Sequence, residues 1–250
     1  INVAADPDFA PENAPNITSA QYASIVSQGG GYQTDWSPIV GAAGAGKKIV
    51  LARRVPTSGT QGSSNIHFLK NPCSEGVQGA LSPATAADSS GTFDVIENSG
   101  TGNVKEALTT AEGNGDFAIG VMSMENDWRV ETRSTRQQYR FVSLDGVHPE
   151  AGSQQGNNAN GTPYYTARQT SINGDYQYHM EMRYYVANTA SGFAASIIPE
   201  IVGGLASPAD CSATPRGLTL NPLTGSACGS AVVVKGTNFG NNCKAQVLFF

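Results

Sequence analysis

Residues 50–60 read VLARRVPTSGT, and QGSSNIHFL follows directly at 61–69. The apolar run ahead of the two arginines predicts a buried strand, and the apolar spacing after the turn predicts a helix over 60–70. A strand that enters a helix through a Ser-Gly-Thr turn leaves unpaired backbone N–H groups and the positive end of the helix dipole at that turn. The stretch therefore predicts both a unit of an α/β fold and an anion-binding turn.

Four residues of this turn form the candidate ligand-binding site. The strand delivers both Arg53 and Arg54 to this turn, and a guanidinium can hold an oxyanion bidentately. Of the two, we expect Arg54 to clamp the ligand. Ser58 and Thr60 would donate their hydroxyls, and Gly59 and Thr60 would donate backbone N–H groups. The alternative is a surface arginine pair on an edge strand beside an ordinary serine that caps a helix.

Predicted strands and helices alternate along most of the chain. The alternation predicts an α/β fold with a mixed sheet flanked by helices. Strands are expected at 1–5, 47–55, 92–97, 116–122, 139–144 and 176–186, helices at 16–26, 60–70, 104–111 and 191–201, and loops at 74–91 and 150–163.

The last part of the chain has a different character. From Gly217 onward, short β-prone runs alternate with Gly and Asn turns. We place a domain boundary near residue 206, so that an α/β domain covers 1–205 and a β-rich segment covers 206–250.

Composition limits the functional classes. The 250 residues include only 14% charged residues, with a net charge of -5, and 29 glycines. The chain has no basic run of the kind that binds nucleic acid, and no apolar run near the roughly 20 residues that cross a bilayer. The N-terminus carries no signal-peptide pattern. A low-charge chain rich in Gly, Asn, Ser and Thr favours a periplasmic or extracellular protein.

The four cysteines predict a disulfide rather than a metal site. No pair has the Cys-x-x-Cys spacing of a zinc site, and the histidines lie far from the cysteines in sequence. Cys211, Cys228 and Cys243 fall in the last forty residues, with Cys73 far ahead of them. We expect one local disulfide, either Cys228–Cys243 or Cys211–Cys228. The alternative is four free thiols.

Two glycine-rich stretches resemble phosphate-binding turns. Residues 41–48 read GAAGAGKK, but Lys48 stands where the P-loop motif needs Ser or Thr, and the stretch enters a strand instead of a helix, so we reject it. Residues 99–103 read SGTGN and open a predicted helix. Simple capping by Ser or Thr is the favoured interpretation there. The alternative is a second set of donors that face the same ligand.

No catalytic constellation is evident in the sequence. His67, His148 and His179 are isolated and are interpreted as structural, and no two carboxylates have a spacing that indicates acid–base catalysis. We therefore expect a protein that is not an enzyme and that needs neither a cofactor nor a metal.

Several segments, in order, resemble the phosphate-binding proteins of ABC transporters, within the type 2 periplasmic-binding-protein superfamily. The resemblance covers roughly residues 1–202 and lacks much of the family's first lobe. The segments that carry it are ITSAQYASIV from Ile17, TDWS from Thr34, RRVPTSGT from Arg53, SGTGNVKEAL from Ser99, FAIGVMS from Phe117, LDGVHP from Leu144 and NGDYQY from Asn173.

The resemblance implies an extracytoplasmic receptor for a small oxyanion, phosphate before sulfate, that delivers its ligand to a membrane transporter without chemistry. It implies that Arg54, Ser58, Gly59 and Thr60 hold the ligand. Pro56 departs from the family pattern, because the family usually has an acidic residue there that accepts the proton of hydrogen phosphate. This departure predicts weaker discrimination between phosphate and sulfate.

The C-terminal segment resembles part of an IPT/TIG-type immunoglobulin-like domain. The likeness lies in LNPLTG from Leu220, AVVVKGTNFG from Ala231 and QVLF from Gln246. A β-sandwich cut this short leaves an open edge. The second functional interpretation is therefore a structural or assembly protein, such as a surface filament or adhesin, whose identical subunits exchange strands and bind no ligand.

Overall fold

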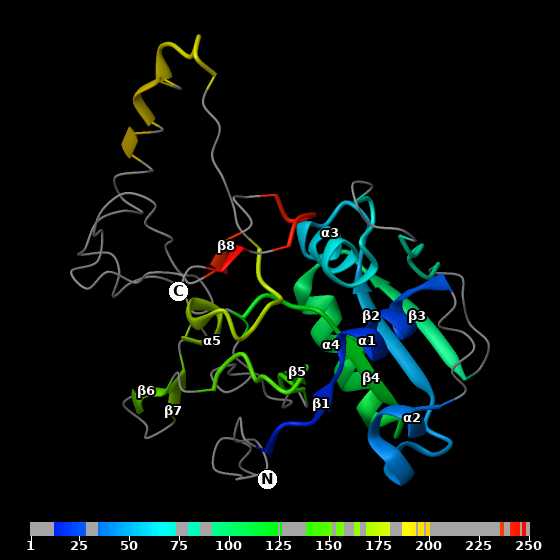
Figure 1. The fold of residues 1–250 in the computed structure, drawn as a ribbon. Coiled ribbons are helices and arrows are strands. Elements are labelled where there is room, and N and C mark those ends of the chain that lie inside the picture. Colours follow the sequence, from blue (N-terminus) through cyan, green and yellow to red (C-terminus); the bar gives the residue numbers. More distant parts are fainter. Residues whose placement is uncertain are drawn as a thin grey trace.

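The computed structural model describes residues 13–28, 35–73, 80–85, 92–124, 126, 139–151, 154–157, 163–165, 169–180, 187–193, 195–197, 199–200, 236–237, 241–245 and 247–248. Helices alternate with parallel strands, which is the α/β class that the sequence predicts (Figure 1). None of the helices within these ranges is long and apolar enough to cross a membrane.

A sheet of three parallel strands organises the fold. Strand β2 (Ile49–Arg54) lies between β3 (Phe93–Asn98) and β4 (Phe117–Gly120), so the order is β3-β2-β4. In the register, Ile49 stands opposite Phe93 on one side and Phe117 on the other. Continuous apolar residues suit β2, because a central parallel strand is covered on both faces.

The chain adds strands first on one side of β2 and then on the other. The chain leaves β2 through α3 (Gly59–Ser64) to reach β3 on one side, and then passes through α4 (Thr101–Gly113) to β4 on the other side. Because all three strands are parallel, their carboxyl ends meet at one edge of the sheet. In open α/β sheets, ligands bind beyond this edge, where the strand order reverses.

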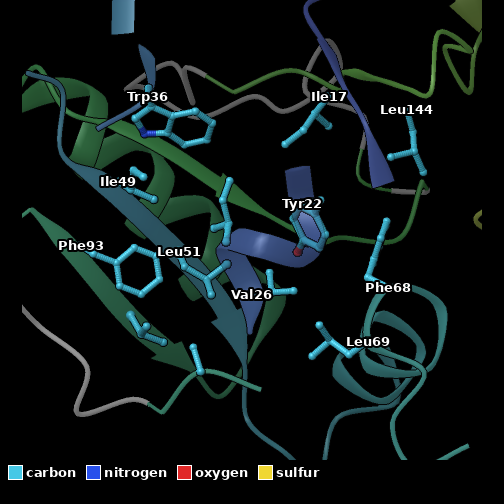
Figure 2. Packing of buried hydrophobic residues seen from close by; sticks show 13 residues of the cluster. Ile17, Tyr22, Val26, Trp36, Ile49, Leu51, Phe68, Leu69, Phe93 and Leu144 are labelled. Atoms are coloured by element: carbon cyan, nitrogen blue, oxygen red, sulfur yellow. The ribbon is translucent and has the colours of Figure 1, made fainter. Parts of the chain in front are cut away.

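Two apolar clusters cover the two faces of the sheet. On one face, Ile49 and Leu51 pack against α1 (Ser19–Val26) and the aromatic rings shown in Figure 2. On the other face, Ala52 packs against Val104 and its neighbours on α4. Burying a large apolar side chain contributes roughly 1.5–3 kcal/mol, so these two clusters are a main source of stability.

Helix α1 begins later than the sequence predicts. Asn16–Ile17 form strand β1, which pairs in parallel with β5 (Ser143–Leu144), and the helix starts only at Ser19. Thr18 and Gln21 form a reciprocal capping box that marks this start. The expected helix over 16–26 is therefore wrong at its first turn, because pairing with β5 overrides the helical spacing.

The tryptophan before β2 closes the amino edge of the sheet. Trp36 is buried, and its indole N–H donates to the carbonyls of Lys48 (3.2 Å) and Phe117 (2.9 Å). It precedes α2 (Ser37–Val40) and a short 3₁₀ helix, η5 (Gly41–Gly44). The rejected phosphate-loop pattern thus lies in η5 and the turn into β2.

The helix expected at 60–70 exists but has two parts. The α-helical turns of α3 continue into a π-helix, η6 (Asn65–Leu69), which ends at Lys70 in a left-handed conformation. π-helical turns occur frequently at functional sites. The segment 59–69 links the predicted anion-binding turn to the aromatic part of the core.

Three sequence predictions are wrong where the structure describes the residues, and one helix was not predicted. Within 139–144 only β5 is a strand, and residues 176–180 form no strand. The expected loop at 150–163 instead contributes β6 (Gln154–Asn157), which pairs antiparallel with β7 (Pro163–Tyr165). Helix α5 (Gln169–Asn173) follows β7 and was not expected. Local pattern missed these elements because their pairing partners decide them.

The remaining predictions lie partly outside the described residues. Residues 193, 195–197 and 199–200 are helical, as expected for 191–201. In the predicted C-terminal segment, the described strands are β8 (Gly236–Thr237) and β9 (Val247–Leu248), which pair antiparallel. The strand expected at 1–5 and most of 206–250 fall outside the described ranges.

A disulfide joins Cys73 to Cys243 across 170 residues of sequence. It contradicts the expected Cys228–Cys243 pair and the alternative of four free thiols, whereas Cys211–Cys228 falls outside the described residues. Proximity in sequence misled here, because the folded chain brings the tail next to the turn after η6. A disulfide fits an oxidising environment outside the cytoplasm.

Gly120 on β4 has no room for a side chain. A Cβ there would lie 2.5 Å from the Ala52 carbonyl oxygen and 3.2 Å from Val104, whereas a Cβ at Gly113 would meet nothing within 4 Å. We expect G120A to lower the free energy of unfolding by about 1–3 kcal/mol. The matched variant G113A should not lower the free energy of unfolding in urea denaturation, because Ala is up to about 1 kcal/mol more favourable than Gly in a helix. Equal effects of both variants would contradict the close packing of β4 on β2.

The cysteine pairing can be checked by peptide mapping. Digestion without reductant should give one linked species that contains the Cys73 and Cys243 peptides, and reduction should separate them. A control digest of thiol-blocked, reduced protein should lack that mass. A species that links Cys228 to Cys243 would instead support the pairing expected from sequence and contradict the fold at this point.

Candidate functional site

The candidate site lies at the carboxyl edge of the sheet, where β2 and β3 end side by side. The N–H of Val55 donates to the Asn98 carbonyl (3.0 Å), and the Asn98 side-chain amide donates to the Arg53 carbonyl (3.1 Å). Asn98 is buried, so these bonds hold the two strand ends together. The turns that open α3 and α4 therefore start from adjacent, fixed points.

Arg54 reaches across to the start of α4. Its guanidinium donates through Nη2 to the Ser99 carbonyl (2.9 Å) and through Nη1 to the Thr101 hydroxyl (3.1 Å). Each terminal nitrogen of an arginine carries two N–H groups. These contacts therefore orient the guanidinium while using one N–H of each terminal nitrogen. Within the described part of the chain, the buried Nε of Arg54 has no hydrogen-bond partner.

Arg53 points to the opposite face of the sheet. Its guanidinium pairs with Glu97 on the neighbouring strand at 3.1 Å and also donates to the Ala84 carbonyl. Successive side chains of a strand alternate between faces, so the two arginines cannot share one ligand as a pair. The expectation that the strand delivers both arginines to one anion is therefore wrong for Arg53. With its side chain only 11% exposed, Arg53 holds the loop around Ala84 to the sheet.

The Ser58–Thr60 turn is not covered by packing. Gly59 is exposed, and Ser58 and Thr60 are partly buried. Ser58 occupies the N-cap position, yet its hydroxyl makes no capping hydrogen bond. The N–H of Gly62 closes the first turn on the Ser58 carbonyl (2.9 Å), which leaves the preceding N–H groups as the unpaired donors of a helix start.

Gln61 joins this turn to the end of β2. Its side-chain oxygen accepts from the N–H of Arg54 (3.2 Å), and its side-chain nitrogen donates to the Asn65 side-chain oxygen (2.9 Å). Gln61 is 8% exposed, so the bonds are largely shielded from water. Sequence reasoning overlooked this residue. The signal was a polar residue on the buried face of a helix's first turn.

The start of α4 lacks the side-chain cap that the sequence favours. Gly100 occupies the N-cap position and has no side chain, and the Ser99 hydroxyl instead donates to the Asn103 side-chain oxygen (3.3 Å). The Thr101 hydroxyl accepts from Arg54. Capping by Ser or Thr is thus wrong here. The role of Thr101 as a partner of Arg54 was also missed, because it depends on which strands are adjacent.

The polar groups at this edge are mainly hydrogen-bond donors, and one of them, the guanidinium, is positively charged. The four predicted residues offer a guanidinium, two hydroxyls and backbone N–H groups, and the neighbouring carboxylate of Glu97 is engaged by Arg53. No group of three His, Cys, Asp or Glu residues able to hold a metal occurs among the described residues. The arrangement is suited to an anion.

The predicted site residues lie on two helix openings. It places Arg54 at the end of β2 with its guanidinium at the α4 opening, and it places Ser58, Gly59 and Thr60 at the α3 opening that follows the same strand. Both helix openings lack a side-chain cap. Arg53, which precedes this set in sequence, belongs to the other face.

Comparison of the chain with protein-family models, with curated proteins and with solved structures finds no significant match. The family resemblance therefore stays a prediction from the residues that carry it.

Proposed function

We propose that this chain binds a small oxyanion of the phosphate and sulfate class at the carboxyl edge of its sheet, and releases it chemically unchanged. The observation that carries the proposal is the placement of Arg54, whose guanidinium is oriented by Ser99 and Thr101 at an uncapped helix opening. An oriented guanidinium loses little further freedom when it binds a ligand, which favours affinity.

Two further features support anion binding at this edge. The Ser58–Thr60 turn adds hydroxyls and backbone N–H groups at a second uncapped helix opening, directly after the strand that carries Arg54. The strand order adds a second feature: in open α/β sheets with this order, ligands bind at the carboxyl ends of the first and third strands, here β2 and β4, and β2 carries Arg54.

The proposed site favours no particular protonation state of its ligand. Pro56 is exposed and its side chain supplies no acceptor next to the turn, and Glu97 is bound to Arg53. A protonated anion such as hydrogen phosphate would therefore gain no carboxylate partner from these two positions. We expect sulfate and phosphate to bind with similar affinity.

Two related inferences concern the fold type and the cellular location of the protein. We infer that the α/β part is a lobe of the periplasmic-binding-protein type and that the protein works in the periplasm or outside the cell. The disulfide between Cys73 and Cys243 supports that location. The partner would be a membrane transporter that accepts the anion from the lobe.

Titration calorimetry tests the proposal directly. Wild-type protein should release or absorb heat with both phosphate and sulfate, whereas R54A should bind each anion roughly 10–100-fold more weakly, because a hydrogen bond to a charged group contributes about 1.5–3 kcal/mol. T101V, which removes the hydroxyl that orients Arg54, should weaken binding by less, roughly 2–10-fold.

A charge-matched control separates local binding from the loss of one positive charge. Lys47 lies at the opposite, amino edge of the sheet, where it donates to the Gly115 carbonyl at 2.8 Å. K47A should bind phosphate like the wild type. The proposal fails if folded wild-type protein gives no heat with either anion, or if K47A and R54A lose the same affinity.

The alternative function, a structural or assembly protein of identical subunits, predicts a different behaviour in solution. An anion receptor should elute as a single monomeric species in size-exclusion chromatography with light scattering. Filaments or rings in electron micrographs, together with no anion binding, would favour the assembly interpretation. Reduced protein should be run alongside, because subunits linked by disulfides would otherwise resemble an assembly.

A further inference from the structure

Four aromatic side chains gather at the end of the helical segment 59–69 that lies away from the candidate site. The ring centroids of His67 and Phe68 are 4.7 Å apart, those of His67 and Tyr178 are 4.9 Å apart, and those of Phe68 and Tyr178 are 4.8 Å apart. Tyr22 of α1 adds a fourth ring, 4.4 Å from Phe68. Figure 2 shows Tyr22 and Phe68 within the main core.

Side chains hold residues 176–180 on this helical segment. The segment forms no strand, so it lacks the ladder of hydrogen bonds that would fasten a strand to a sheet. Tyr178 packs its ring against both His67 and Phe68, and its hydroxyl lies 3.0 Å from the Ser63 hydroxyl. Ring packing and this hydroxyl contact therefore join the segment to the helix within the described residues.

The surroundings of His67 disfavour a positive charge. Among the described residues, neither ring nitrogen of His67 has a hydrogen-bond partner, although an imidazolium needs two acceptors. Lys70, whose ammonium donates to the His67 carbonyl at 2.7 Å, and His179 of the attached segment bring further positive charge. Asp145 is the carboxylate that acts in the opposite direction, and it already accepts hydrogen bonds from Ser19.

The tyrosines of the cluster carry no negative charge that could stabilise an imidazolium at His67. Burial raises the pKa of Tyr22 to about 12, and it raises the pKa of Tyr176 and Tyr178 above their ordinary value, so all three rings stay neutral. Burial, followed by Lys70 and His179, lowers the pKa of His67 from 6.5 to about 4. Attraction between an imidazolium and the Tyr178 ring would oppose this shift only in part.

We propose that the contact of residues 176–180 with segment 59–69 is an acid-sensitive latch, which opens when His67 takes up a proton, leaves its stack and frees Tyr178. The proposal does not depend on anion binding. Opening would detach the segment from the helix that begins at the Ser58–Thr60 turn and withdraw Tyr178 from the periphery of the main core, while the sheet and the buried residues of that core remain folded.

The direction of the pH dependence follows from linkage. With the latch open, His67 has its ordinary pKa of 6.5, and with the latch closed its pKa is about 4. The open form therefore binds the proton first as pH falls. The equilibrium constant for closing has its full value above pH 6.5. It falls roughly tenfold for each pH unit between 6.5 and 4 and does not change further below pH 4.

A nuclear magnetic resonance titration of the full chain from pH 7.5 to 3.5 tests the latch. The His67 ring shift reports protonation, and cross-relaxation between the His67 and Tyr178 rings reports closure. We expect the contact signals to fall at least tenfold as His67 becomes protonated, while the Trp36 indole N–H, which is bound to the Phe117 carbonyl, persists. Contact signals that survive protonation, or that vanish only together with Trp36, would overturn the proposal.

Two variants sharpen the test. H67F keeps an aromatic ring that cannot be charged, so Tyr178 should stay attached down to pH 3.5. H179Q removes a nearby positive charge but leaves His67 in place, so opening should still occur and the His67 midpoint should move toward 6.5. Opening of H67F at the wild-type pH would refute the latch. If H67F does not fold, the wild-type titration decides alone.

Discussion

The whole architecture depends on the central position of β2 in a parallel sheet. Both of its edges are hydrogen-bonded, to β3 and to β4, and both of its faces are covered by apolar side chains. A strand held in this way cannot shift by one residue without sending Ile49 and Leu51 to the wrong face. Its carboxyl end is therefore a fixed point, and this rigidity allows Arg54 to be placed accurately.

Parallel pairing also explains why the candidate site is assembled from separate parts of the sequence. Because β2 and β3 end at the same edge, the turns after Arg54 and Asn98 open next to each other although about forty residues separate them. Two hydrogen bonds from the Arg54 guanidinium then join the first turn to the second. A site built on strand ends is more rigid than one built on loops alone.

The sequence predicted the elements that have a strong period of their own. Strands β2 and β3 and helix α4 lie where apolar spacing placed them, because each buries a face that the pattern reveals locally. The turn at Ser58 was found for the same reason, as a break between two such patterns. The α/β class follows from their alternation, and it needed no knowledge of distant contacts.

The errors share one physical cause, which is that the deciding partner lies far away in sequence. Asn16 became a strand residue because β5 pairs with it, and Cys243 found Cys73 instead of a nearby cysteine. Thr101 was expected to cap a helix or to supply a donor, but it accepts a hydrogen bond from Arg54, whose strand β2 lies beside β3, the strand that leads into the helix of Thr101. Local spacing carries no information about such neighbours.

The two ends of the helical segment 59–69 have different chemical environments. Its first turn is polar and partly exposed, with hydroxyls and N–H groups that no side chain caps, and its last turn is aromatic and packed against the core. The buried side chain of Gln61 ties the first turn to β2, and the ring of Tyr178 holds the last turn to a segment over a hundred residues away. Both ends belong to one short helical segment, and the change from α-helix to π-helix lies between them. The helix that would present an anion to Arg54 is thus also the helix whose far end responds to charge on His67.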